Sequence, residues 1–398
     1  HDFTDNIIHL VLARLPDAPI GIKGISLFVV PKFIVNDDGA IGSRNDVRCV
    51  SLEHKLGIHA SPTAVLAYGD KGGATGYLIG ERNRGLEYMF IMMNLARFSV
   101  GMEGVGISER AYQRAATFAR ERIQGRSVGF PSDVANTTII EHPDIRRMLM
   151  TMRAYTEAMR AVAYETAATL DVARHHPNDS IRAQQQSQAE FMVPVIKGWC
   201  TETAQQVTSL GLQIHGGMGY IEETGVAQYT RDVRITTIYE GTTSIQANDF
   251  VSRKTARDGG KAARGRIQEI LITANELSAS DATNLVGLGE ALRDSADWLR
   301  ESLEIVLERL VSSPREAFAV SVPYLELWGV VCGGWQMGRA ALVASQKMAT
   351  CTGEKTFLAS KLATSRYYIE ALLPRGGALV AEIRARGNTV FTLLAEHF

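Results

Sequence analysis

The sequence predicts an α+β protein that is mostly α-helical, and changes of pattern along the chain carry this prediction. Short apolar runs separated by turn residues come first, long stretches with helical periodicity follow, and a glycine-rich, charged segment precedes further helices. We therefore expect part of an antiparallel β-domain over residues 1–83, a four-helix bundle over 84–255 and a second, C-terminal helical domain over 265–398.

The first region contains four apolar runs that are rich in β-branched and aromatic residues and are bounded by glycine, proline and polar turn residues. Runs of this length and composition predict strands of an antiparallel sheet or of part of a barrel. The four predicted strands cover residues 7–12, 24–31, 63–68 and 75–79.

Helical periodicity begins near Leu86, where apolar residues start to recur at intervals of three and four. Such stripes are typical of the buried face of each helix in a bundle. The expected helices are 88–122, one with a stripe over 145–162, one with a stripe over 192–210, and one that begins near residue 242. Thr242, Thr243 and Ser244 supply hydroxyls that can cap the last helix, and Pro194 should end, kink or open the third.

Residues 256–264 are glycine-rich and charged, which predicts a linker, and helical periodicity returns after them. Two apolar stripes and two further helical segments are expected in this part of the chain, at 267–277, 292–310, 320–350 and 355–372. These helices form the predicted second helical domain.

The composition argues against several classes of protein. The 398 residues include 42 Lys and Arg and 43 Asp and Glu, and a net charge of −1 argues against nucleic acid or an anionic membrane as the main partner. No apolar stretch reaches about 20 residues, so no membrane span is expected. None of the four cysteines forms a C-x-x-C pair, which argues against zinc or another metal site and against a disulfide framework, and favours a reducing, cytoplasmic compartment. These cysteines are Cys49, Cys200, Cys332 and Cys351.

Chemically suggestive residues gather between residues 213 and 246. Gly216 and Gly217 permit a close approach of a ligand to the backbone, or a tight reversal of the chain. Glu240 precedes a predicted helix whose first turn offers free N–H groups and hydroxyls, which suit a phosphate or the polar edge of a ring. An acidic residue at such a helix start is a candidate base beside a cofactor.

Each of these features also has an ordinary structural interpretation. A glycine pair after a helix is commonly a C-cap, and a glutamate before a helix commonly complements the helix dipole. Arg231 and Asp232 fit a structural ion pair, and His215 fits a packing residue of a loop. Spacing alone leaves both interpretations open.

Taken together, these motifs resemble the signature blocks of the acyl-CoA dehydrogenases. The blocks are Gln213–Tyr220, Arg231-Asp232 and Ile238–Gln246, and upstream segments agree in the right order, namely 24–31, 80–97 and 121–126. The helices after residue 256 resemble the longer bacterial members of this family, including those that act on 3-methylmercaptopropionyl-CoA. The resemblance covers residues 3–255 through many separate motifs, and so is more specific than any single motif.

The resemblance implies a FAD-dependent α,β-dehydrogenation of an acyl-CoA thioester to the trans-2-enoyl-CoA, as in fatty acid metabolism. It implies that Glu240 removes the pro-R α-proton, while the β-carbon gives a hydride to N5 of the flavin. Gly241 would lie against the thioester, together with Tyr239 as a substrate-binding residue. Asn94 and Arg97 would lie near the path of the CoA pantetheine.

The resemblance also assigns residues to the cofactor. Arg122 and Gln124 would contact the FAD pyrophosphate region. Three residues would hold the adenosine end of a FAD that is bound mainly by a second subunit, namely Gln213, Gly216 and Gly217. Three more would face the flavin, namely Thr242, Thr243 and Ser244.

Further expectations concern partners and completeness. The family implies a homodimer or tetramer and an electron-transfer flavoprotein as electron acceptor. The chain is expected to begin after the N-terminal domain and the loop that covers the flavin in family members. Three hypotheses therefore stand: an acyl-CoA dehydrogenase or a piece of one, an acyl-CoA oxidase that passes electrons to oxygen, and a non-catalytic, FAD-free fragment or scaffold subunit.

Overall fold

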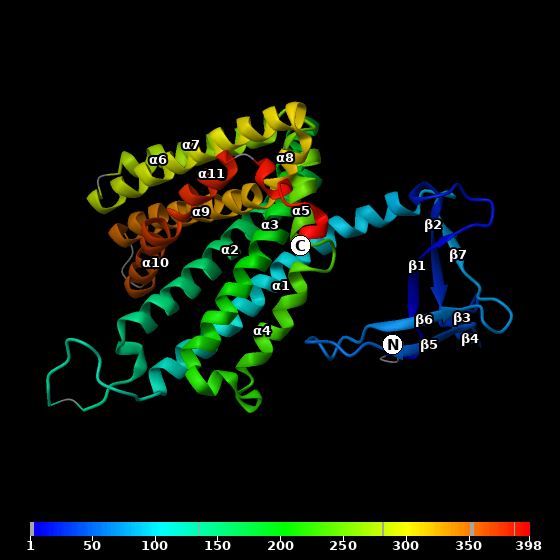
Figure 1. Ribbon diagram of the computed structural model, residues 1–398, viewed down its shortest axis with the longest axis horizontal. Helices are drawn as coiled ribbons and strands as arrows, with labels where there is room; N and C mark the ends of the chain where they lie inside the picture. Colours follow the sequence, from blue (N-terminus) through cyan, green and yellow to red (C-terminus); the bar gives the residue numbers. More distant parts are fainter. Residues whose placement is uncertain (1–3, 134, 281, 351–353, 386) are drawn as a thin grey trace. The chain divides into compact units, whose positions relative to one another are not determined.

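The computed structural model describes residues 4–133, 135–280, 282–350, 354–385 and 387–398. The chain forms two compact units, residues 1–96 and residues 97–398, and each is described by itself (Figure 1). The first unit contains small antiparallel sheets, and the second is helical. The predicted fold class, α+β and mostly α, is therefore confirmed.

The first unit holds one three-stranded sheet and two strand pairs, all antiparallel. The three-stranded sheet has the order β1-β2-β7, in which Leu12 of β1 and Ile79 of β7 both pair with Leu27 of β2. The strands are β1 Ile8–Arg14, β2 Ile25–Pro31, β3 Phe33–Val35, β4 Ile41–Arg44, β5 Val47–Leu52, β6 Ala64–Tyr68 and β7 Tyr77–Ile79.

All four predicted strands exist, as β1, β2, β6 and β7, and the structure adds β3, β4 and β5. Buried Asn45 ties the unit together, because its Nδ2 donates to Pro31 O at 2.8 Å and to Thr75 O at 2.9 Å. The hairpin of β3 and β4 lacks a long apolar run, which explains why hydrophobic patterning alone does not reveal it.

The second unit begins at Arg97, within helix α1. The first five helices are α1 Gly85–Glu121, α2 Pro143–His175, α3 Asp179–His215, α4 Val226–Arg234 and α5 Thr243–Asp249. The expected fourth helix is the short α5, which continues as a π-helical turn over Phe250–Thr255, and α4 was not expected. Pro194 lies inside α3 without ending it, because the surrounding residues are buried and tertiary packing outweighs the lost hydrogen bond.

Small residues let α1 lie directly against α3. A Cβ atom at Gly101 would lie 2.5 Å from Ile196 Cγ2, and one at Gly104 would lie 2.9 Å from Cys200 O. Larger side chains at either glycine would therefore push the two helices apart. This close approach brings the residues of α1 next to the middle of α3, where the candidate site lies.

The C-terminal helices are arranged around α9, which packs on α2, α3, α5, α6, α7, α10 and α11 (Figure 1). The helices are α6 Lys261–Ser278, α7 Thr283–Ser312, α8 Pro314–Ala319, α9 Ser321–Thr350, α10 Lys355–Tyr367 and α11 Arg375–Arg384. The predicted linker is shorter than expected. Asp258 accepts hydrogen bonds from three backbone N–H groups at the start of α6, so the helix already begins at Lys261.

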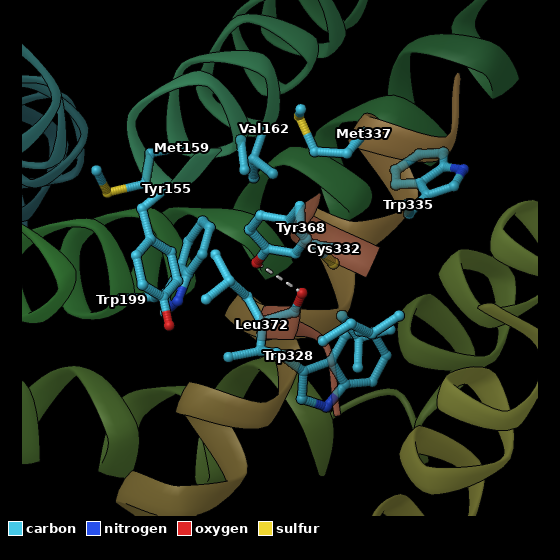
Figure 2. Packing of buried hydrophobic residues seen from close by; sticks show 14 of the residues in the cluster. Tyr155, Met159, Val162, Trp199, Trp328, Cys332, Trp335, Met337, Tyr368 and Leu372 are labelled. Atoms are coloured by element: carbon cyan, nitrogen blue, oxygen red, sulfur yellow. Dashed lines mark hydrogen bonds between the residues drawn. The ribbon is translucent and has the colours of Figure 1, made fainter. Parts of the chain in front are cut away.

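The bundle helices and the C-terminal helices share one core (Figure 2). Tyr155 of α2 and Trp199 of α3 pack with Trp328 of α9 and with Tyr368, whose hydroxyl donates to Val330 O at 3.0 Å. Burial of each large side chain contributes about 1.5–3 kcal/mol. The core therefore holds α3, which carries much of the candidate site, from both sides.

Three observations concern only the described part of the chain. None of its helices combines the length and apolarity that a membrane span requires. Cys49, Cys200 and Cys332 are free thiols, whereas Cys351 lies outside the described residues. No group of histidine, cysteine and acidic residues within the described ranges has the arrangement of a metal site.

Candidate functional site

The site is built around the turn that joins residue 239 to helix α5. Glu240 adopts a left-handed backbone conformation with φ 55°, and Gly241 follows with φ 91°. A non-glycine residue in this region costs on the order of 1–3 kcal/mol and persists only where its surroundings enforce it. Within the described ranges of the second unit, Glu240 is the acidic residue that carries this strain.

Two buried side chains enforce this conformation. Gln246, fully buried on α5, donates from Nε2 to Glu240 O at 3.1 Å and to Gly241 O at 3.3 Å. Lys197, fully buried on α3, donates from Nζ to Gly241 O at 2.7 Å. Donors from two different helices thus hold the two carbonyl groups of the turn. They fix the position of the Glu240 backbone, from which the side chain extends.

Lys197 is a cation in an apolar stretch of α3. Burial lowers the pKa of Lys197 to about 8, although the negative charges of Glu202 and Glu240 act to raise it and Arg97 acts to lower it further. The charged lysine is therefore poorly solvated by the protein. Its ammonium group contributes positive potential next to the turn that carries Glu240.

Two exposed carboxylates lie on either side of the turn. Tyr239 donates its phenolic hydrogen bond to Glu103 of α1, and Thr243 Oγ1 donates to Glu202 Oε1 at 2.5 Å. Burial raises the pKa of Tyr239, and the hydrogen bond and the charge of Glu103 raise it further. Tyr239 is therefore a neutral hydroxyl group at physiological pH that is fixed in one orientation.

A buried ion pair joins α1 to α5 at the site. Arg97 Nη1 of α1 donates to Asp249 Oδ2 of α5 at 3.1 Å, and both side chains are buried. Within the described ranges, Arg97 Nε is buried without a hydrogen-bond partner. Much of the hydrogen-bonding capacity of Arg97 is thus directed at Asp249 of α5.

The three hydroxyl residues after Gly241 have different environments. Thr242 is the N-cap of α5 and accepts a hydrogen bond from Ile245 N at 3.3 Å, which confirms the predicted helix start. Thr243 is engaged with Glu202, and Ser244 is exposed. Thr242 and Ser244 are thus both exposed, whereas Thr243 is partly buried.

A second cluster lies at the end of α3. Gln213, Gly216 and Gly217 are exposed there. Gly216 has φ 59° and ψ −139°, a conformation that glycine adopts readily and that ends the helix. A Cβ at Gly217 would meet no atom within 4 Å, so packing in the described chain does not explain a glycine there.

His215 beside this cluster is a packing residue. Its ring stacks on Phe118 with centroids 4.3 Å apart, and its Nδ1 lies 2.8 Å from Gly211 O. Burial lowers the pKa of His215, which favours the neutral ring. A neutral ring that donates from Nδ1 leaves Nε2 as an acceptor. Within the described ranges, Nε2 is buried without a partner.

The remaining predicted residues lie elsewhere in the chain. Arg122 and Gln124 are exposed and adjacent, with Arg122 Nη2 donating to Gln124 Oε1 at 3.3 Å. Asn94 is an exposed residue of α1 within the first unit. Arg231 pairs with Glu222 at 2.7 Å, and Asp232 accepts from Gln228 at 3.1 Å. Within the second unit, the predicted cofactor and catalytic residues thus fall into the turn cluster, the cluster at the end of α3 and the exposed pair Arg122 and Gln124.

Sequence reasoning assigned no role to several residues that build the turn cluster. Lys197 and Gln246 hold the turn, Asp249 binds Arg97, and Glu103 and Glu202 flank the turn. Lys197 left one detectable signal, because it is a charged residue inside the run of buried residues 191–201. The others lie at sequence separations that helical periodicity does not connect.

Two family models match the chain. The model described as the acyl-CoA dehydrogenase C-terminal domain matches residues 83–254. The model described as acetyl-CoA dehydrogenase C-terminal like matches residues 265–393. Among curated proteins, 3-methylmercaptopropionyl-CoA dehydrogenase of Ruegeria pomeroyi is 50% identical over 392 residues, which are 98% of this chain and 66% of that relative.

Solved structures share the fold. Caenorhabditis elegans ACDH-11 in complex with C11-CoA matches with a TM-score of 0.74 at 21% identity, over 98% of this chain and 61% of its own. An acyl-CoA dehydrogenase from Bacillus anthracis complexed with FAD matches with a TM-score of 0.68 at 19% identity, over 94% of this chain and 60% of its own. The chain therefore spans less than two thirds of the length of these relatives.

Proposed function

Because the chain belongs to the acyl-CoA dehydrogenase family, we propose that its activity is the FAD-dependent α,β-dehydrogenation of an acyl-CoA thioester, with Glu240 as the base. The observation that carries this proposal is the strained turn at Glu240 and Gly241, whose carbonyl groups are fixed by Lys197 and Gln246. Strain that is enforced by buried donors is typical of functional sites.

The role of Glu240 follows from the acidity of the substrate. The α-proton of a thioester is weakly acidic, so its removal needs an ionised carboxylate in a fixed position and away from bulk water. The turn supplies the fixed position, and the partial burial of Glu240 limits its contact with water. The backbone N–H of Glu240 is proposed to polarise the thioester carbonyl and so to stabilise the enolate-like charge.

The residues proposed for FAD fit such a ligand in kind. Gly217 has open space where a side chain would be, and Arg122 and Gln124 offer exposed donors for a pyrophosphate. Thr243 and Ser244 lie in the first turn of α5, where free N–H groups add donors. When bound, FAD supplies the acceptor for the hydride that leaves the β-carbon.

The finer assignments complete the proposal. Asn94, Arg97, Tyr239 and Gly241 are proposed to contact the acyl-CoA, and a second copy of the chain is proposed to share the FAD through residues 213–217. An electron-transfer flavoprotein is the proposed electron acceptor. FAD in the Bacillus anthracis structure and C11-CoA in the Caenorhabditis elegans structure support these ligand classes.

The decisive experiment exchanges the base for its amide. Glu240→Gln should retain the FAD content of the parent chain and slow α-proton exchange of a bound acyl-CoA in deuterated water by about 10²–10⁴-fold, because the amide cannot accept the proton. Mass spectrometry of the acyl-CoA measures the exchange. Glu308→Gln, an exposed glutamate of α7, serves as the matched control and should exchange at the parental rate.

Two outcomes would contradict the proposal. Retained exchange in Glu240→Gln would place the base elsewhere, and absence of flavin from the purified parent chain would favour the scaffold hypothesis. Oxygen consumption during acyl-CoA oxidation, in place of reduction of an electron-transfer flavoprotein, would favour an oxidase.

A further inference from the structure

Lys197 is a fully buried cation that a base at Glu240 does not in itself require. Lysines are almost never fully buried unless they are paired. In the part of the chain that the structure describes, Lys197 is hydrogen-bonded to one backbone carbonyl, that of Gly241, and forms no ion pair with a carboxylate. A buried ammonium group that is satisfied so incompletely lowers stability, so its presence needs another explanation.

The position of Lys197 supplies that explanation. Gly241 O is also bound by Gln246, so the carbonyl already has a neutral donor without the lysine. What the lysine adds is a short bond of 2.7 Å and a full positive charge directly behind the turn. A charged donor at this point acts on the residue that the turn presents, which is Glu240.

Charged side chains from α1, α3 and the turn act on Lys197. Helix α1 contributes Arg97 and Glu103, α3 contributes Glu202, and the turn contributes Glu240. Asp249 of α5 is paired with Arg97 and also with the more exposed Arg253. The charges of Glu103, Glu202 and Glu240 all act to raise the pKa of Lys197, so the ammonium group attracts each of these carboxylates.

We propose that Lys197 is a positioning residue of the site, which fixes the Gly241 carbonyl behind Glu240 and whose charge favours the ionised form of the Glu240 carboxylate. This proposal rests on the proposed function of Glu240. As a positioning residue, Lys197 transfers no proton and contacts neither the substrate nor the flavin. Its charge extends to lower pH the range over which Glu240 can accept the α-proton.

The first test compares pH profiles of α-proton exchange. Lys197→Met keeps the volume of the side chain but removes its charge, so the acid limb of the profile should move to higher pH by about one pH unit. At a given pH on the acid limb, the variant should therefore exchange about tenfold more slowly than the parent chain. Lys197→Arg retains a charge and should restore the position of the limb. Lys347→Met, on the exposed face of α9, is the matched control and should leave the profile unchanged.

A second variant separates the charge from the hydrogen bonds. Gln246→Leu removes the neutral donor to Glu240 O and Gly241 O and leaves every charge in place. It should slow exchange without moving the acid limb. A limb that moves as far in Gln246→Leu as in Lys197→Met would overturn the proposal, because loosening of the turn would then explain both.

A readout that needs no activity distinguishes this proposal from the proposed function. Carbon-13 NMR of chain labelled at the glutamate δ-carbon follows the titration of Glu240, whose signal is identified by its absence from Glu240→Gln. In Lys197→Met this titration should move to higher pH even if the chain exchanges no α-proton. An unchanged titration of Glu240 would overturn the role of Lys197, whether or not Glu240 is the base.

Discussion

Lys197 and Arg266 are both buried cations of the second unit, and the chain satisfies them in opposite ways. Arg266 Nη1 lies 2.7 Å from Glu165 Oε1 and 2.9 Å from Glu269 Oε2, and its guanidinium lies 4.9 Å from the centre of the Trp335 ring. Lys197 has one carbonyl partner. Burial acts to lower the pKa of both residues. Carboxylates outweigh it at Arg266 and raise that pKa, whereas burial prevails at Lys197.

This difference separates a cation that joins helices from one that serves a site. Arg266 of α6 is bound to α2 through Glu165 and stacks on Trp335 of α9, so three helices depend on its charge. Lys197 holds a single turn and remains poorly compensated. The comparison implies that loss of the first charge harms folding, whereas loss of the second harms the proposed chemistry and spares folding.

The largest expected effect is the loss of Arg266. Arg266→Met should lower the free energy of unfolding by about 3–5 kcal/mol, because Glu165 and Glu269 would be left without their buried partner. Urea unfolding, followed by circular dichroism, measures the change. Arg264→Met removes an exposed pair with Glu304 and should cost less than about 1 kcal/mol. Equal losses in the two variants would show that Arg266 is no stronger a link than a surface pair.

Lys197→Met should instead raise the free energy of unfolding. The pKa of Lys197 falls from 10.5 to about 8 on folding, so the charged form opposes folding at neutral pH by about 3 kcal/mol. The lost hydrogen bond to Gly241 O offsets about 1 kcal/mol, which leaves a gain of about 2 kcal/mol.

The pH dependence of stability tests the same point. Between about pH 8 and 10.5 the unfolded chain binds more protons at this lysine than the folded chain does, so parental stability should rise with pH over that window. Lys197→Met should lack this rise. Urea unfolding at pH 7 and pH 9.5, with Lys347→Met as the control, measures both effects. A variant less stable than the parent at pH 7 would make Lys197 a structural residue.

Much of the fold could be predicted because periodicity directly reflects burial. The stripe around Met152 and Met159 became α2, and the hydroxyl of Thr242 capped α5 as expected. The short α11 escaped prediction because its start carries two glycines, which disfavour a helix. Gly376 lies there against Trp298, where a Cβ would lie 2.9 Å from the ring. Packing with a distant residue, invisible to local patterns, explains that helix.

Some residues of the candidate site could be predicted from the sequence, and others could not. Glu240 and Gly241 could be named as candidates from the sequence because they are adjacent within one motif. Lys197 is 44 residues from Gly241, and Arg97 is 152 residues from Asp249, so only the packing of α1, α3 and α5 brings them together. A lysine within an apolar helix has no sequence feature that indicates which carbonyl it meets.

The smallest expected effect tests whether the turn itself is specific, and two glycines allow a matched comparison. Gly241 and Gly259 both have positive φ, at 91° and 64°. A Cβ at Gly241 would lie 2.7 Å from Gln246 Nε2, whereas one at Gly259 would meet nothing within 4 Å. Both alanine variants carry backbone strain of about 1 kcal/mol, but only Gly241→Ala must also displace the amide that holds Glu240.

Gly241→Ala should therefore lose about 1 kcal/mol more than Gly259→Ala in urea unfolding, because the displaced Gln246 amide loses its contact with the turn. It should also slow α-proton exchange, while Gly259→Ala exchanges at the parental rate. Equal stability losses with normal exchange in both variants would mean that the turn tolerates movement of Gln246. The contrast between a rigid site and an ordinary helix-connecting turn would then fail, and Lys197 alone would have to hold Glu240 in place.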